Sequence, residues 1–285
     1  FFSRLPIPLL PLDEQRRVGE ILDTADLAIG ETKTLISKLK HMKTGLMHDL
    51  LTRGLDEHGQ LRDPDAHPEQ FKDSPLGRIP REWKVSRLSE VVPRAEYGVS
   101  VPLNDETGIP VLRMNNLKDG EADLSEIKTS SSEEARNLQL KPLDVLFNRT
   151  NSMEHVGRTG IWRGQFSHAS FASYLVRLVP DTSRLAPEYL NLWLNLPETQ
   201  IQIRRVATPG VQQVNINPTN LRKELIALPS ALSEQGRIVE VLDAHDARIH
   251  AEEAYCDKLS LQKKGLMDDL LMGRVRVMAG QEVGS

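Results

Sequence analysis

The chain has 285 residues, of which 39% are hydrophobic, and a formal net charge of -4 at pH 7. This length leaves room for one sizeable domain and long helices, while the negative charge excludes DNA binding through overall charge, so that a DNA-binding surface has to be local. The single cysteine excludes a disulfide framework and a cysteine-rich zinc site. Because no apolar run is long enough to span a membrane, we expect a cytoplasmic protein.

The first predicted element is a long helix over residues 13–54, and residues 1–12 read like the end of a preceding domain. From Arg17 to about Thr52 the apolar residues recur at spacings of three and four without a proline, which is typical of a coiled-coil seam. Asp13 is a favourable N-cap, and Gly54 is typical of a helix end. The alternative is that such a stripe is ordinary core.

A polar linker, residues 55–75, separates this helix from a domain predicted over residues 76–228. The linker shows neither helical nor strand periodicity. Short apolar or alternating runs then predict strands at residues 83–88, 110–114, 144–147, 160–162 and 174–178. Helices are predicted at residues 187–194 and 199–205, the first with a proline in its first turn. This mixture predicts an α+β class, with one mixed α/β domain.

The sequence of this domain favours binding over catalysis. It contains no phosphate loop, no glycine-rich dinucleotide turn and no His-Glu-x-x-His zinc helix. Lys and Arg slightly outnumber Asp and Glu, and polar groups gather at the predicted strand ends. Arg pairs with guanine, and Asn or Gln with adenine, in the DNA major groove, although amide-rich loops are also ordinary turns. The candidate DNA-contacting residues are Arg113, Asn115, Asn116, Arg149, Asn151, Arg158, Gln212, Gln213 and Asn215.

The second long helix, predicted over residues 229–275 and followed by a flexible tail at 276–285, repeats the first. Gly45–Leu51 recurs as Gly265–Leu271, and Glu14–Asp23 aligns with Glu234–Asp243 at the same offset. Ser233 and Gly273 match Asp13 and Gly54 as its start and end signals. A constant offset predicts two helices that pack as an antiparallel coiled coil around one domain. The predicted seam residues are Val18, Ile21, Leu22, Ile29, Leu35, Leu39, Leu46, Ile238, Val241, Leu242, Ile249, Leu259 and Leu266.

Together these segments resemble the specificity subunit of type I restriction-modification systems. The motifs that carry the resemblance are the two Pro-x-x-Glu-Gln helix starts, at Pro11–Val18 and Pro229–Ile238, the two Gly-Leu-Met segments, and the opening Gly77–Trp83 of the domain. Further similar segments within the domain are Gly108–Arg113, Leu140–Leu146, Pro187–Leu190 and Gln213–Asn215. The resemblance covers nearly the whole chain.

The resemblance implies a non-catalytic chain whose target-recognition domain reads one half of a bipartite double-stranded DNA site. It implies docking of methyltransferase (M) and restriction (R) subunits, and the helix faces with Lys33, Lys38, Lys40, Lys43, Lys258, Lys263 and Lys264 are candidates for contact with M subunits. S-adenosylmethionine, ATP and magnesium are expected in those partners and no cofactor in this chain. With one complete recognition domain, the chain is either part of a two-domain subunit or a half-subunit that self-associates. Two other classes stay open, a coiled-coil adaptor that binds protein and an enzyme with an unrecognised site.

Overall fold

The computed structural model describes residues 10–103, 107–210 and 213–277. The chain divides into two compact units, one made of Phe1–Lys43 with Asp243–Ser285 and the other of Thr44–Leu242. The long helices α1 (Leu12–Arg53) and α7 (Leu232–Leu271) each contribute to both units.

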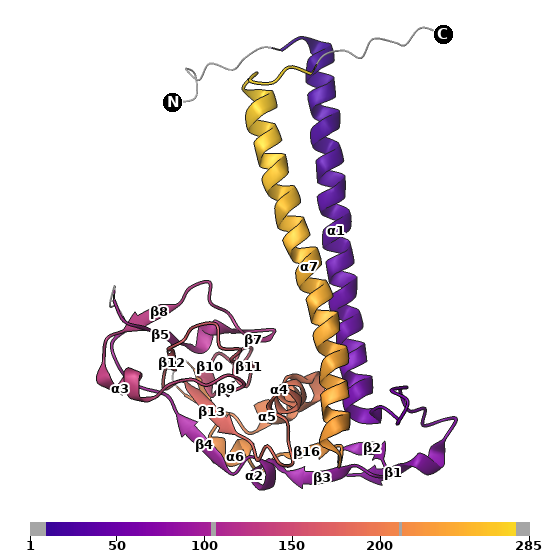
Figure 1. The fold of residues 1–285 in the computed structure, drawn as a ribbon, viewed down its shortest axis with the longest axis vertical. Coiled ribbons are helices and arrows are strands. Elements are labelled where there is room, and N and C mark those ends of the chain that lie inside the picture. The colour runs from indigo at the N-terminus through magenta and orange to yellow at the C-terminus, as the bar shows by residue number, and fades with distance from the viewer. Residues whose placement is uncertain (1–9, 104–106, 211–212, 278–285) are drawn as a thin grey trace. The chain divides into compact units, whose positions relative to one another are not determined.

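In the first unit, α1 and α7 pack side by side as an antiparallel pair (Figure 1). The amino group of Lys40 lies 2.6 Å from the Glu253 carboxylate, whereas that of Lys263 lies 2.5 Å from Asp26. The later residue of α1 therefore pairs with the earlier residue of α7, and the reverse, as antiparallel packing requires. The prediction of two long helices that pack antiparallel around an α+β domain is confirmed.

The seam between these helices is narrower than the sequence predicts. Val18, Ile29 and Leu39 of α1 are buried. The buried residues of α7 in this unit fall on one heptad line, Ile249, Cys256 and Leu270. The remaining predicted seam residues of this unit, Ile21, Leu22, Leu35 and Leu259, are half-buried.

The sequence pattern wrongly predicts that Val241 and Leu266 lie in the seam. Each of these residues is 38% exposed. Val241 precedes the buried Leu242, and one residue rotates a side chain by about 100° around a helix. Leu266 lies four residues before Leu270, about 40° from the buried line. At the other end of the pair, Leu46, Ile238 and Leu242 pack into the core of the second unit.

The helix ends follow the predicted signals closely. Gly54 and Gly273 adopt φ angles of 66° and 67°, in the left-handed region that glycine tolerates, immediately beyond the helices. The helices begin at Leu12 and Leu232, so Asp13 and Ser233 lie in the first turn instead of at the N-cap. An acidic residue in the first turn still interacts favourably with the helix dipole.

The described part of the second unit is built on a six-stranded sheet with the strand order β4-β13-β9-β11-β7-β6. β11 and β7 are parallel, and the other neighbours are antiparallel. The strands are β4 (Arg94–Tyr97), β6 (Leu117–Lys118), β7 (Gly120–Ala122), β9 (Val145–Asn148), β11 (Thr159–Ile161) and β13 (Leu175–Val179).

Smaller sheets and short helices surround this sheet. The two-stranded sheets are β1 (Phe71–Ser74) with β2 (Gly77–Pro80), and β3 (Lys84–Arg87) with β16 (Leu225–Leu228). The three-stranded sheets are β5 (Ile109–Leu112) with β8 (Lys128–Ser130) and β12 (Ser170–Phe171), and β15 (Val214–Asn215) with β10 (Thr150–Asn151) and β14 (Thr208–Pro209). The helices are α2 (Leu88–Val91), α3 (Glu133–Asn137), α4 (Pro187–Asn195), α5 (Pro197–Arg205) and α6 (Pro218–Leu221), with 3₁₀ turns η2 (Pro68–Gln70) and η3 (Met114–Asn116).

All five predicted strands of the domain are confirmed, as β3, β5, β9, β11 and β13, and so are the two predicted helices, as α4 and α5. The absence of regular structure predicted for the linker is wrong at its end. Phe71 is buried there and pairs with Pro80 in β1–β2. The polar residues Lys72, Asp73 and Ser74 that complete this strand hide it from a periodicity search.

The first turn of α7 is embedded in the domain. The Gln235 side chain donates hydrogen bonds to the carbonyl oxygens of Arg184 and Pro229 and accepts one from the Ala186 amide. The Tyr189 hydroxyl donates to the Ala227 carbonyl at 3.0 Å, and burial, reinforced by the Glu234 charge, raises the pKa of Tyr189 well above its usual value. Tyr189 therefore stays neutral and serves the core.

Candidate nucleic-acid interface

One end of each of the six strands lies at the same edge of the central sheet. β4, β6 and β9 finish at this edge, whereas β7, β11 and β13 start there, as their pairing directions require. The polar and aromatic residues at the edge come from positions far apart in the sequence. We call this set the strand-end surface: Tyr97, Lys118, Arg149, Arg158 and Tyr174.

Arg149 occupies the middle of the strand-end surface, directly after β9. Its amide donates to the Tyr174 carbonyl at 3.0 Å, and its own carbonyl accepts from the Ile216 amide at 2.8 Å. The guanidinium carbon lies 5.3 Å from the centre of the Tyr97 ring, within the range of a cation–π contact. Its Nε atom is buried and has no hydrogen-bond partner among the described residues.

Two exposed tyrosines flank this arginine. Tyr97, at the end of the edge strand β4, is 53% exposed, and Tyr174, directly before the mostly buried β13, is 46% exposed. An exposed ring provides a stacking surface and a hydroxyl group that can donate or accept. Neither tyrosine was a sequence candidate, because a tyrosine at a strand end is equally compatible with a buried position.

The candidates of the amide-rich loops form a small sheet that continues from Arg149. β10 pairs with β15, so that Thr150 faces Asn215, and the Thr150 hydroxyl donates to the Asn215 side-chain oxygen. The Thr208 hydroxyl donates to the Asn215 carbonyl at 3.1 Å. Arg149, Asn151, Gln213 and Asn215 are thereby brought together, while Gln212 lies outside the described residues.

Two of the amide candidates serve the fold itself. Asn116 is 1% exposed; its side-chain oxygen accepts from the Arg113 amide, and its nitrogen donates to the Asp123 carbonyl. Asn151 is buried, and its side-chain oxygen accepts from the Ser152 amide at 2.8 Å. Because the Asn116 side chain is paired at both its oxygen and its nitrogen and Asn151 is buried, we remove both from the set of candidate base contacts.

The other candidates differ in how free their side chains are. Asn115 is exposed on η3, beside the half-buried Arg113 whose guanidinium donates to the Glu126 carbonyl at 2.7 Å. The Asn148 side chain donates to the Met114 carbonyl at 3.2 Å, which ties η3 to the end of β9. Arg158, half-exposed, is connected to the same strand because its carbonyl accepts from the Asn148 amide at 2.8 Å.

Two asparagines of α4 hold part of this edge in place. The Asn195 side chain bonds both to the backbone of Thr159 and to its hydroxyl group, the latter at 2.6 Å. The Asn191 amide donates to the Gly120 carbonyl at 2.8 Å. These bonds fix the first residues of β11 and β7, so that Lys118 and Arg158 project from a rigid support.

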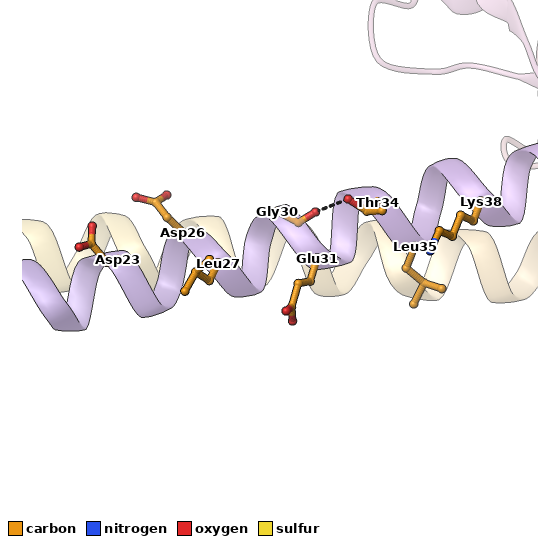
Figure 2. A pocket seen from close by; sticks show the side chains of 8 residues that line it. All are labelled: Asp23, Asp26, Leu27, Gly30, Glu31, Thr34, Leu35 and Lys38. Atoms are coloured by element: carbon orange, nitrogen blue, oxygen red, sulfur yellow. Dashed lines mark hydrogen bonds between the residues drawn. The ribbon is translucent and has the colours of Figure 1, made fainter.

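The first unit offers a different kind of surface. Figure 2 shows a shallow depression on α1 with acidic, apolar and basic side chains along it, lined by Asp23, Asp26, Leu27, Gly30, Glu31, Thr34, Leu35 and Lys38. Three of the lysines proposed for docking, Lys40, Lys43 and Lys263, instead form ion pairs between the two helices. Lys33, Lys38, Lys258 and Lys264 are exposed.

Within the ranges that the structure describes, no group of three or more His, Cys, Asp or Glu residues could hold a metal ion. None of the described helices is both long and apolar enough to cross a membrane.

Comparisons with known proteins agree with the geometry. A family model for the type I restriction modification DNA specificity domain matches residues 80–259. The chain is 26% identical over 284 residues to the type I restriction enzyme MjaVIII specificity subunit of Methanocaldococcus jannaschii. This alignment covers 97% of this chain and 63% of that subunit. It is 25% identical over 264 residues to the EcoBI specificity subunit of Escherichia coli, covering 90% of this chain and 53% of that subunit. The chain thus spans about half the length of the EcoBI subunit.

Among solved structures, the type I restriction-modification system S subunit from M. genitalium has a similar fold. The TM-score is 0.55 at 12% identity, with 91% of this chain and 61% of that chain covered.

Proposed function

The chain belongs to the family of type I restriction modification DNA specificity domains, and from this premise we propose that it is a non-catalytic DNA-recognition subunit. Its target-recognition domain reads one half of a bipartite double-stranded DNA site. The observation that carries the proposal is the strand-end surface, where Lys118, Arg149 and Arg158 gather beside two exposed tyrosines.

The chemistry of this surface suits DNA. Arginine and lysine neutralise phosphates and supply the local attraction that a chain of net charge -4 lacks. Arginine also reads guanine, and exposed amides such as Asn115 can read adenine. The sequence candidates that stay proposed DNA contacts are Arg113, Asn115, Arg149, Arg158, Gln212, Gln213 and Asn215.

The helix pair is the proposed docking site for M subunits, with R subunits joining the same complex. Its exposed cations, Lys33, Lys38, Lys258 and Lys264, lie outside the ion pairs that connect the helices. We propose that S-adenosylmethionine, ATP and magnesium bind to those partner subunits. With one recognition domain described, a complete bipartite site requires a second domain, either on the same polypeptide or on a second copy.

The proposal is tested with this chain combined with its M subunits on a randomised double-stranded DNA library, followed by sequencing of the methylated sites. We expect one conserved half-site, and a split palindrome if two copies assemble. We also expect the affinity for DNA to fall steeply between 50 and 200 mM salt, by about 10³-fold or more for a protein with six or more phosphate contacts. A folded complex without sequence preference would contradict DNA recognition by this domain. A folded chain that shows neither affinity for DNA nor salt dependence would favour the adaptor instead.

A further inference from the structure

We propose that Arg149 reads a guanine in the DNA major groove and that Tyr97 is the positioning residue that holds its guanidinium for this contact. The inference rests on the proposed function and names one base and one residue pair within it. The guanidinium carbon of Arg149 lies 5.3 Å from the centre of the Tyr97 ring.

The backbone of Arg149 is held on both sides. Its amide donates to the Tyr174 carbonyl and its carbonyl accepts from the Ile216 amide, so the residue before β13 and the residue after β15 fix the position of its backbone. This residue joins β9 to β10, and β9 is buried along its whole length. The arginine therefore starts from a rigid point and not from a mobile loop.

The side chain is also restrained while its terminal groups stay available. Nε is buried and has no hydrogen-bond partner among the described residues, and the Tyr97 ring restricts the orientation of the guanidinium plane. Guanine presents two acceptors in the major groove, O6 and N7, and a fork of arginine N–H donors matches both. Holding the plane before binding lowers the entropy lost when the two bonds form.

Several other arginines of the domain form hydrogen bonds or ion pairs with protein groups. Arg177 bonds to Glu96 and Asp144, and Arg163 bonds to the Glu121 carboxylate at 2.8 Å. Arg113 donates to the Glu126 carbonyl, and Arg204 donates to the Gln200 side chain. Arg149 differs from these four because no hydrogen bond or ion pair of its side chain is formed within the described residues, while its guanidinium lies beside the exposed Tyr97 ring.

Tyr97 is suited to a positioning role. It ends β4, where it pairs with Val176 of β13, so its backbone is fixed by the central sheet. Its ring is 53% exposed, although a phenol of this size normally lies buried when it serves only the core. The contact with Arg149 needs the ring and not the hydroxyl group. A Phe replacement keeps the ring and an Ala replacement removes it, so the two variants should behave differently.

The experiment is the methylation of a randomised double-stranded DNA library by the M-subunit complex of wild type, Arg149→Lys, Arg149→Ala, Tyr97→Phe and Tyr97→Ala. Arg94→Ala, an exposed arginine at the opposite end of β4, is the matched control. In both Arg149 variants we expect one guanine position of the half-site to lose its preference by about 10- to 100-fold, with the other positions unchanged. Lys keeps the charge and loses the fork, so it distinguishes base reading from phosphate binding.

We expect Tyr97→Phe to match wild type and Tyr97→Ala to weaken the preference at the same guanine position. In the Arg149→Ala background, Tyr97→Ala should then have no further effect on that position. Circular dichroism and complex formation verify that every variant folds.

Three results would overturn the inference. One is a loss of methylation in Arg149→Ala that is equal at all positions and is restored in Arg149→Lys, because this pattern identifies a phosphate contact. Another is an unchanged half-site in both Arg149 variants. A third is a change at an adenine or thymine position only. Each result leaves DNA recognition by the domain intact, whereas a wild-type complex without sequence preference rejects the proposed function itself.

Discussion

The indole Nε1 of Trp83 donates a hydrogen bond to the carboxylate of Glu234, with 3.1 Å between Nε1 and Oε1. The same oxygen accepts from the Leu55 amide at 3.1 Å and from the Arg62 guanidinium at 2.6 Å. Leu55 follows α1, Trp83 opens the domain and Glu234 begins α7, so one buried carboxylate joins three segments that are distant in the sequence.

The sequence repeat reproduces part of this joint in the other unit. Glu14 occupies the position equivalent to Glu234 and is also buried. Its carboxylate accepts from the Arg276 guanidinium at 2.9 Å and from the Val277 amide at 3.2 Å, just beyond the end of α7. In both copies the glutamate of the Glu-Gln pair therefore binds an arginine and a backbone amide from the segment that follows the other long helix.

Removal of the Glu234 carboxylate should be strongly destabilising. We expect Glu234→Ala to lower the free energy of unfolding by about 3–5 kcal/mol, because the largely buried Arg62 guanidinium loses its counter-charge. Glu234→Gln keeps an acceptor oxygen and should cost less. Urea unfolding followed by circular dichroism measures both, with the exposed Glu240→Ala as a control that changes stability by about 0.5 kcal/mol or less. A value for Glu234→Ala as small as that of the control would show that the joint contributes nothing.

The two repeated helix-end glycines should respond differently to the same substitution. Gly273→Ala introduces only the strain of a left-handed alanine, about 1 kcal/mol, since nothing lies within 4 Å of the added Cβ. The Cβ of Gly54→Ala would lie 2.5 Å from Glu234 Oε1 and 2.5 Å from the Trp83 ring, so we expect a further loss of about 1–3 kcal/mol. Thermal unfolding of the two variants measures both losses of stability. Equal losses in the two variants would refute the predicted crowding at Gly54.

Ion pairs between the helices should contribute according to their burial. Lys43 lies 2.6 Å from Asp246 with both side chains mostly covered, whereas the equally short Lys40–Glu253 pair is more exposed. We expect a coupling of about 1 kcal/mol for the first pair and about 0.5 kcal/mol or less for the second. Double-mutant cycles at low and high salt measure both couplings. A larger or more salt-resistant coupling for Lys40–Glu253 would contradict this ranking.

Leucines of α1 should separate into seam and surface positions. Leu39 is 2% exposed, so Leu39→Ala should cost about 2–4 kcal/mol through lost burial and the cavity that remains. Leu27 is 69% exposed and lines the depression in Figure 2, so Leu27→Ala should change stability by about 0.5 kcal/mol or less. Comparable losses in the two variants, measured by chemical unfolding of the chain alone, would mean that Leu27 packs in solution.

Much of the fold follows from local patterns. Apolar residues at spacings of three and four predict the long helices, because a helix places such residues on one stripe. The fixed offset between the two copies predicts their pairing, and the glycines that end them were identified correctly at Gly54 and Gly273. Strands with a continuous apolar or alternating core, such as β9 and β13, were also predicted from sequence.

The short polar strands were not predictable in this way. β1, β10 and β15 contain two to four residues each, with little apolar content. They are extended because they pair with neighbouring strands, and a local sequence pattern does not show this pairing. The sequence also did not show which amide side chains are exposed and which are buried. Asn115 and Asn116 are adjacent and chemically identical, yet the first is exposed and the second is buried, with one hydrogen bond at its side-chain oxygen and one at its nitrogen.

By itself, the sequence determined the two long helices, their antiparallel pairing and the α+β class of the domain between them, since each depends on periodicity or repetition along the chain. Only the tertiary structure decided which residues face one another across long distances in sequence. Trp83 reaches Glu234 and Arg149 reaches Tyr97 because strand register and helix packing bring them together, and neither contact leaves a local signal. The physical reason is that hydrogen-bonded register is a property of paired segments, whereas periodicity is a property of one segment alone.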